Sequence, residues 1–165
     1  MRYNKIKKID TINSLRGINV SLWTQGCPHG CVGCFNFETH DSTKGEEFTE
    51  VEQELILKEL DNNVKKNLSI LGGEPLVSYN LEGVYNLCKY IKEKRPETII
   101  IIWTGYLYEE VKDFNFNILD YIDYLIDGKF VLSLKKNLKL RGSSNQRVID
   151  IKKTKANNFV TLLDC

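Results

Sequence analysis

Apolar and polar positions along the chain follow two alternating periods, which predict strands and helices in turn. Strands are predicted at residues 17–23, 67–71, 98–103 and 121–126. The third contains four consecutive isoleucines, a run typical of a strand buried on both faces of a parallel sheet. Helices are predicted at 49–66, where Thr49 and Glu52 form a capping box, at 80–94, which ends before Pro96, and at about 106–112.

Strands that alternate with helices predict right-handed βαβ units and a mainly parallel sheet. A closed eightfold barrel needs about 250 residues, whereas this chain has 165. We therefore predict one α/β domain over residues 1–165, with an open, curved, mainly parallel sheet and flanking helices, resembling a truncated (β/α) barrel. In the less regular tail, 138–141 and 147–151 are predicted to pair as a hairpin, and 159–163 to form a final strand.

Each predicted strand ends in a loop of unusual composition. These loops are the cysteine-rich segment 27–34, then Gly72-Gly73-Glu74-Pro75, Thr104-Gly105-Tyr106 and Asp127-Gly128-Lys129. Ligands of parallel sheets bind at the carboxyl ends of the strands. The pattern therefore predicts that the four loops form one site.

Three of the five cysteines, Cys27, Cys31 and Cys34, fall within eight residues. Three thiolates on a compact loop can hold three irons of a cubane cluster and leave the fourth iron open to a small ligand. The alternative is a zinc site completed by His29 or a distant cysteine. The spacing argues against zinc, because zinc knuckles usually pair one Cys-x2-Cys with a second. His29 is interpreted as a polar loop residue.

The remaining two cysteines are not predicted to bind metal. Cys88 lies on the apolar face of the second predicted helix, where a buried structural thiol is expected. Cys165 is the last residue, and chain ends are often poorly ordered.

Charge is uneven along the chain although the net charge is only +1. Residues 38–61 hold nine acidic side chains against two lysines, and 129–155 hold nine basic ones against Asp150 alone. A basic tail can indicate nucleic-acid binding, but a solvated surface with a role in docking is the favoured interpretation. No signal peptide or membrane-length apolar run is found, and clustered cysteines fit a reducing compartment. A cytoplasmic location is therefore predicted.

The cysteine triplet followed by Gly72-Gly73-Glu74-Pro75 resembles the radical S-adenosylmethionine superfamily. The resemblance implies a truncated barrel of that type and a 4Fe-4S cluster held by Cys27, Cys31 and Cys34. It further implies that the open iron is chelated by the amino and carboxylate groups of S-adenosylmethionine. Gly72 and Gly73 would let the backbone approach the amino group, and Glu74 would offset its charge. We expect these glycines to serve cofactor binding rather than folding.

The adenine side of the predicted site departs from the superfamily pattern. Many members carry an aromatic residue just before the third cysteine, whereas this chain has Gly33 there and Phe35 just after the cysteine. The predicted cofactor contacts on this side are Gly33, Phe35 and Asn36. No catalytic residue is predicted beyond the cluster and the cofactor.

Further motifs narrow the resemblance to the family of activating proteins of anaerobic ribonucleoside-triphosphate reductases. They are Cys34-Phe35-Asn36, Trp103-Thr104-Gly105-Tyr106, Asp127-Gly128-Lys129-Phe130 and the segment 141–147. The resemblance runs from about residue 17 to 151. It implies reductive cleavage of S-adenosylmethionine to a 5′-deoxyadenosyl radical, which removes hydrogen from a glycine of the large reductase subunit.

The resemblance also sets the expected partners and leaves two alternatives. A one-electron donor such as a flavodoxin or ferredoxin is implied, with no nucleic-acid or membrane partner. One alternative is the activase of another glycyl-radical enzyme. The other is a metal-binding module that recognises nucleic acid through the basic tail.

Overall fold

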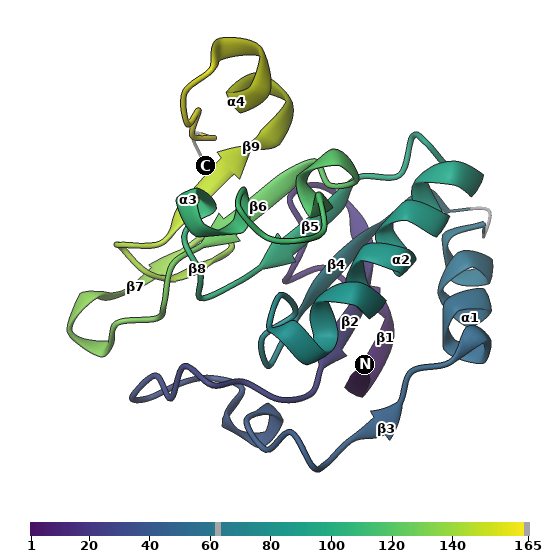
Figure 1. Cartoon of the computed structure of the whole chain (residues 1–165), viewed down its shortest axis with the longest axis horizontal. Helices are drawn as coiled ribbons and strands as arrows, with labels where there is room; N and C mark the ends of the chain where they lie inside the picture. Colours follow the sequence, from purple (N-terminus) through teal and green to yellow (C-terminus); the bar gives the residue numbers. More distant parts are fainter. Residues whose placement is uncertain (62–63, 164–165) are drawn as a thin grey trace.

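The computed structural model describes residues 1–61 and 64–163. A seven-stranded sheet in the order β3-β1-β2-β4-β5-β6-β9 forms its centre (Figure 1). The strands are β1 (Arg2–Asp10), β2 (Ile18–Thr24), β3 (Glu46–Glu47), β4 (Lys66–Gly72), β5 (Ile100–Trp103), β6 (Tyr124–Asp127) and β9 (Arg147–Asp150). The four neighbours β2, β4, β5 and β6 are parallel, while β1, β3 and β9 are antiparallel additions at the edges. The predicted open α/β sheet with a parallel centre is confirmed.

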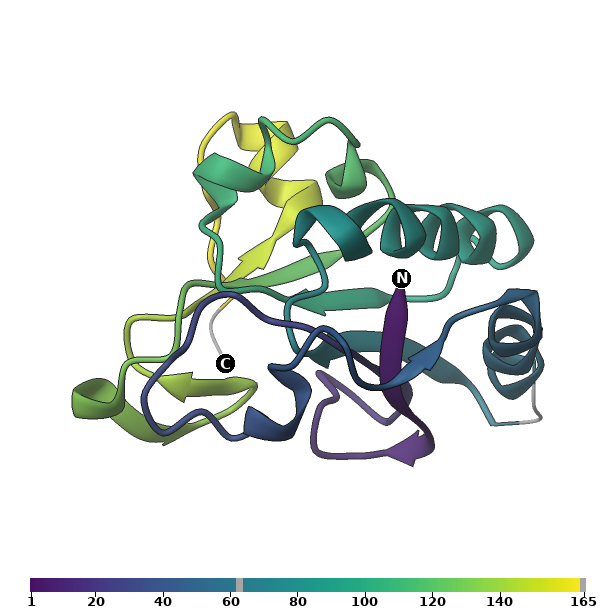
Figure 2. The same ribbon diagram turned by 60° about the horizontal axis from the view of Figure 1, so that its bottom comes forward.

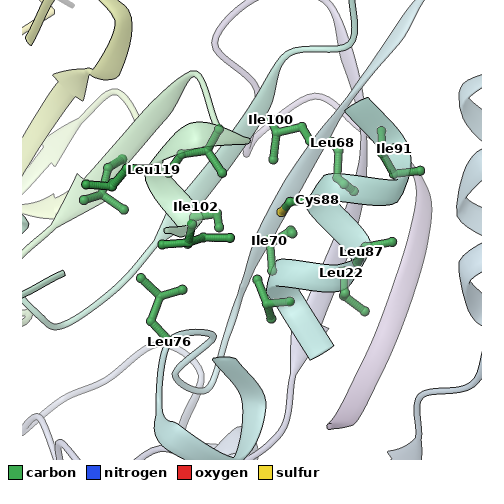
Figure 3. Close-up of a cluster of buried hydrophobic side chains, with 14 of the residues drawn as sticks. Leu22, Leu68, Ile70, Leu76, Leu87, Cys88, Ile91, Ile100, Ile102 and Leu119 are labelled. Carbon is green, nitrogen blue, oxygen red and sulfur yellow. The ribbon is translucent and has the colours of Figure 1, made fainter. Parts of the chain in front are cut away.

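Helices cover one face of this sheet. They are α1 (Glu50–Leu60), α2 (Ser78–Lys94), α3 (Tyr108–Val111) and α4 (Ile151–Asn157), with short 3-10 turns at Phe37–Thr39, Ile118–Asp120 and Leu132–Leu134. Leu68, Ile70 and Ile102 of the sheet are fully buried and pack in one cluster with Leu87 and Cys88 of α2 (Figure 3). The prediction that Cys88 is a buried structural thiol is confirmed. None of the described helices is long and apolar enough to cross a bilayer.

The other face of the sheet carries a smaller apolar cluster. Ile101, Ile126 and Val148 form it, with Trp103 and Leu140 packed against them. Burial on both faces explains the isoleucine run of β5, since neighbouring residues of a strand point to opposite faces. A second hairpin, β7 (Lys135–Leu138) with β8 (Arg141–Ser143), supplies Leu140 and lies beside the cysteine loop (Figure 2).

The helix predicted at 49–66 begins as expected and ends early. Its Thr49–Glu52 capping box is present. The helix ends at Leu60, and Lys66 already belongs to β4. The part of the prediction that falls on residues 62 and 63 lies outside the described residues, as does Cys165.

The tail pairs differently from the prediction. The hairpin of 138–141 with 147–151 is wrong, because β8 pairs with β7 while β9 joins the main sheet beside β6. Instead of a full final strand, 159–163 makes one bridge, between Leu162 and Ile149, and two backbone hydrogen bonds. Strand β1 and helix α4 were not predicted. Only Asp10 of β1 is buried, so the strand has no apolar pattern to reveal it.

Candidate cluster and cofactor site

The carboxyl ends of the four parallel strands open into one cavity of about 580 Å³. Its volume lies within the range of roughly 300–1,000 Å³ that small-molecule sites occupy. All four predicted loops line it, as the parallel topology requires. The predicted site residues at its wall are Cys27, Cys31, Cys34, Phe35, Asn36, Gly72, Gly73 and Glu74. Gly33 does not line the cavity and lies against Leu132 of the 3-10 turn before β7.

The three thiols of the cysteine loop are free and partly exposed. Burial raises the pKa of the Cys27 thiol to about 11. Burial also raises the pKa of Cys34, and the amide N–H of Asn36 partly offsets this by donating to its sulfur at 3.4 Å. Ligand thiols must lose their protons to bind metal. Cluster loading at this loop therefore releases protons.

The donor set of this loop fits an iron–sulfur cluster. Three soft sulfur donors face one cavity, and iron–sulfur clusters are held by cysteine thiolates. Within the described ranges, no three His, Cys, Asp or Glu side chains are already gathered as a metal site. Gly30 and Gly33 have φ values of +60° and +72°, a backbone region that glycine enters at little cost. Loading has to draw the three sulfurs together, and these glycines allow the loop to adjust.

Glu74 is a buried carboxylate of the site, only 1% exposed, and it contacts three loops. Its Oε1 accepts hydrogen bonds from the Leu76 amide at 2.9 Å and the Thr104 hydroxyl at 2.7 Å. Its Oε2 accepts from the Gly105 amide at 2.7 Å and lies 2.7 Å from Nε2 of His29. A carboxylate offers about four lone-pair positions. All four are used inside the protein, so Glu74 acts on a ligand through its charge.

Gly72 and Gly73 are required by the packing of the chain itself. Gly72 has a φ of +110°, and a Cβ there would lie 2.8 Å from the backbone N and O of Thr24. A Cβ on Gly73 would overlap the carbonyl oxygen of Gly26. The Glu74 amide donates to that same carbonyl at 2.7 Å, which ties this loop to the cysteine loop. The expectation that folding does not require these two glycines is therefore wrong, while their contact with the cofactor stays a prediction.

Phe35 lies between the cysteine loop and the β7–β8 hairpin. Its ring meets Phe130 edge-on, with centroids 5.2 Å apart, and Lys135 Nζ lies 5.0 Å from its centroid. The side chain stays 59% exposed at the cavity mouth. A Cβ on Gly142 would lie 3.0 Å from both rings, so this glycine lets the hairpin approach them.

The segment 141–147 fastens that hairpin to the end of β6. Gln146 Oε1 accepts from the amides of Gly142 at 2.9 Å and Ser143 at 3.2 Å, while its Nε2 donates to the Gly128 carbonyl at 3.0 Å. Asn145 donates to the carbonyl of Lys129 at 2.8 Å. These bonds explain why the motifs at 127–130 and 141–147 occur together. They place Lys129 and the hairpin at the cavity.

An ion pair completes this connection. Arg147 binds the buried carboxylate of Asp127 and, on the surface, Glu109 of α3. Both carboxylates raise the pKa of the guanidinium above its usual value. Asp127 also accepts from the Tyr108 amide at 2.8 Å. Arg147 and Asp127 are opposite each other in the antiparallel pairing of β9 with β6, which the sequence did not predict.

Sequence reasoning missed Thr104 and Gln146 as site-building residues and assigned His29 only to the loop. The segments around Thr104 and Gln146 were noted as motifs, but nothing local indicates that their side chains bond to other loops. His29 Nε2 contacts the carboxylate of Glu74.

Comparison with known proteins places these motifs in a family. The 4Fe-4S single cluster domain matches residues 16–149. An anaerobic ribonucleoside-triphosphate reductase-activating protein of Enterobacteria phage T4 is 36% identical over 148 residues, which cover 90% of this chain and 93% of the relative. Proteins of the same description from Vibrio cholerae and Escherichia coli K12 are each 36% identical, over 88% and 90% of this chain and over 96% and 97% of their own lengths.

Proposed function

The chain belongs to the family of anaerobic ribonucleoside-triphosphate reductase-activating proteins, and from this membership we propose that it generates a glycyl radical on such a reductase. It is a radical S-adenosylmethionine enzyme with a 4Fe-4S cluster. The observation that carries the proposal is the agreement of two independent features. The relationship spans about 90% of the chain, and the cysteine loop and the glycine loop meet at one cavity.

Cys27, Cys31 and Cys34 would hold the cluster in this proposal. When bound, the cluster supplies the electron that cleaves S-adenosylmethionine reductively to methionine and a 5′-deoxyadenosyl radical. The backbone at Gly72 and Gly73 would receive the amino group of the cofactor, with the negative charge of Glu74 close by. Gly33, Phe35 and Asn36 are assigned to the adenine side, Gly33 through its backbone in the loop.

The large reductase subunit is proposed to dock over the cavity mouth. Phe35 lines the cavity and is exposed. Further exposed apolar side chains lie on the chain segments next to the lining residues, at Val32, Phe37, Leu132 and Leu134. Lys129, Lys135 and Lys136 line the same cavity and form no ion pair with any described residue. Farther along the basic tail, Arg147, Lys153 and Lys155 are already paired with acidic side chains. We therefore place the docking surface at residues 129–136, which are part of the predicted basic stretch 129–155.

Docking of a protein also satisfies a chemical requirement of the site. A carbon radical at an open cavity would react with stray hydrogen donors unless something covers it. A partner that presents its glycine at the mouth would close the cavity and supply the hydrogen together. The electron is proposed to come from a flavodoxin or ferredoxin in the cytoplasm, where the cysteines remain reduced.

The test reconstitutes the protein anaerobically with iron and sulfide and adds dithionite, S-adenosylmethionine and the large reductase subunit. We expect 5′-deoxyadenosine in the chromatogram and a doublet glycyl radical signal in the electron paramagnetic resonance spectrum. Exposure to oxygen should then cut the large subunit at that glycine. Catalytic turnover of a small molecule without a protein partner would contradict the proposal.

A further inference from the structure

His29 stands between two of the cysteines, yet its side chain points inward and is only 7% exposed. Its ring meets Tyr106 edge-on, with centroids 4.8 Å apart and planes at 73°. Its Nε2 lies 2.7 Å from Glu74 Oε2. The ring is therefore held by an apolar contact on one side and a hydrogen bond to a buried carboxylate on the other.

Glu74 joins His29 to the rest of the cavity wall. The same carboxylate binds Thr104 and the Gly105 amide in the loop after β5, and the Leu76 amide in its own loop after β4. Three loops that come from three parallel strands thus share one anion. Next to His29 in the cysteine loop, a Cβ on Gly30 would meet nothing within 4 Å.

Gly105 provides the space for the imidazole. A Cβ on Gly105 would overlap the Cδ2 atom of His29 and lie 2.5 Å from its Nε2. The backbone of Gly105 has no positive φ that would itself require glycine. The lack of a side chain at this position is therefore explained by the ring that packs on it.

We infer that His29 is a positioning residue, which anchors the loop between Cys27 and Cys31 to Glu74 and so fixes the thiols relative to Gly72 and Gly73. The inference rests on the proposed function. The imidazole takes no part as a metal ligand. Its contribution is to keep the cluster-binding loop and the cofactor-binding loop in one arrangement, so its loss should weaken cofactor binding more than cluster loading.

A double-mutant cycle tests this with His29→Ala, Gly105→Ala and the combined variant. The methyl group of Gly105→Ala should displace the His29 imidazole, so this variant should have the same properties as His29→Ala. When His29 is already alanine, the added methyl should cost nothing further, because neighbouring residues that act through one contact are not additive. His29→Gln should bind S-adenosylmethionine more tightly than His29→Ala, because the glutamine amide nitrogen can donate to Glu74 from a similar position. His40→Ala is the matched control, since its Nε2 has no hydrogen-bond partner among the described residues.

Three measurements separate positioning from folding. Each variant is examined for its thermal midpoint, for iron bound per chain, and for S-adenosylmethionine binding to the loaded protein by equilibrium dialysis. A fourth measurement, the alkylation rate of Cys27 in metal-free protein, reports on the loop without any cofactor. We expect His29→Ala and Gly105→Ala to load iron, to bind S-adenosylmethionine about tenfold more weakly, as loss of a hydrogen bond to a charged group suggests, and to alkylate faster at Cys27.

The outcomes decide the inference independently of the proposed function. Additive effects of the two substitutions, or binding and alkylation equal to the parent protein, would overturn it even if the parent protein forms a glycyl radical. Loss of iron binding in His29→Ala with normal loading in Gly105→Ala would instead identify His29 as a ligand. If His29→Ala fails to fold, Gly105→Ala and His29→Gln still test the contact. If the parent protein loads its cluster but does not activate a reductase, the proposed function is contradicted while the inference on His29 is not.

Discussion

At the scale of the residue, Cys27 and Cys88 show how one side chain takes two roles. Cys27 faces the cavity from a loop that glycines keep adjustable, whereas Cys88 is fully buried between α2 and the sheet. Burial raises the pKa of both thiols. Only Cys27 has space beside it for a metal and a route for its proton to leave.

Replacement of each cysteine should separate these roles. Cys27→Ala, Cys31→Ala and Cys34→Ala are expected to lose the cluster and all cleavage of S-adenosylmethionine, because each removes one of three ligands. Cys88→Ala should keep both and lower the free energy of unfolding by about 1 kcal/mol through a small cavity. Iron analysis and denaturant unfolding measure the two effects. Cluster loss in Cys88→Ala with retention in Cys31→Ala would show that the ligands are assigned wrongly.

The raised pKa of Cys27 predicts a pH dependence of its reactivity. The thiolate is the nucleophile, and the thiol of Cys27 has a pKa of about 11. In metal-free protein, the rate of alkylation at Cys27 should therefore rise about tenfold per pH unit between pH 8 and 10, without a plateau. Free cysteine, with a pKa of about 8.5, should level off within that interval. Mass spectrometry of iodoacetamide-treated protein gives both rates, and an early plateau at Cys27 would contradict the prediction.

Even a methyl side chain at Gly73 should lower the stability of the protein. A methyl group there would overlap the carbonyl of Gly26, so Gly73→Ala is expected to cost roughly 2 kcal/mol of stability, as overpacking commonly does. It should also weaken cofactor binding, because the glycine loop must move. Gly17→Asn is the control, since Gly17 has a φ of +77° but no neighbour within 4 Å of its Cβ position. Equal thermal midpoints for the two variants would contradict the packing argument.

At the scale of the element, the β7–β8 hairpin depends on the side chains that fasten it. Few hydrophobic contacts hold this two-stranded sheet, and an isolated hairpin is marginally stable in water. The hairpin is held instead by side-chain hydrogen bonds to backbone carbonyls, from Gln146, Asn145 and Trp103. The Trp103 indole donates to the Leu140 carbonyl at 2.7 Å. The position of the proposed docking surface is thus set from outside the hairpin.

Gln146→Ala should release that hairpin locally. The substitution removes the acceptor of the Gly142 and Ser143 amides, and an unpaired buried donor costs about 1–3 kcal/mol. Hydrogen exchange at these two amides should accelerate by at least about tenfold, while exchange in β4 and β5 stays unchanged. Activation of the reductase should also decrease in Gln146→Ala, because the hairpin no longer keeps its position. Thr49→Ala is the control: it removes the N-cap of α1 and should lower the free energy of unfolding by about 1 kcal/mol without reducing activation. Unchanged exchange at both amides would show that Gln146 is dispensable.

At the scale of the whole molecule, charge is arranged around the open end of the sheet. Lys129, Lys135 and Lys136 line the cavity without an ion pair to any described residue, while Arg147, Lys153 and Lys155 of the tail face acidic partners. Such a field mainly accelerates and orients encounter between proteins.

Reversal of these charges should therefore slow docking. The combined variant Lys129→Glu, Lys135→Glu and Lys136→Glu is expected to lower the association rate with the large reductase subunit by about tenfold or more at low salt, with a smaller effect at high salt. A control variant with the same change in charge replaces three exposed lysines elsewhere by glutamate. These are Lys58 in α1, Lys65 before β4 and Lys94 at the end of α2. Surface plasmon resonance or stopped-flow measurement gives the rates. Equal slowing by both triples would mean that net charge, and not this surface, governs association.

The sequence by itself determined the parallel centre of the sheet, the order of its loops and eight of the residues that line the cavity. These features depend on local patterns: runs of β-branched residues, a helix cap, and cysteines and glycines at strand ends. The tertiary structure decided the edge strands, the hairpin and the bonds of Glu74, Arg147 and His29. Strand β1 has little apolar pattern because Asp10 is its only buried residue. Strand β9 pairs with β6 through the backbone, which sets Arg147 beside Asp127, twenty residues away in sequence. A side chain that is satisfied across such a distance leaves no periodic signal, so only the folded chain shows which loop it holds.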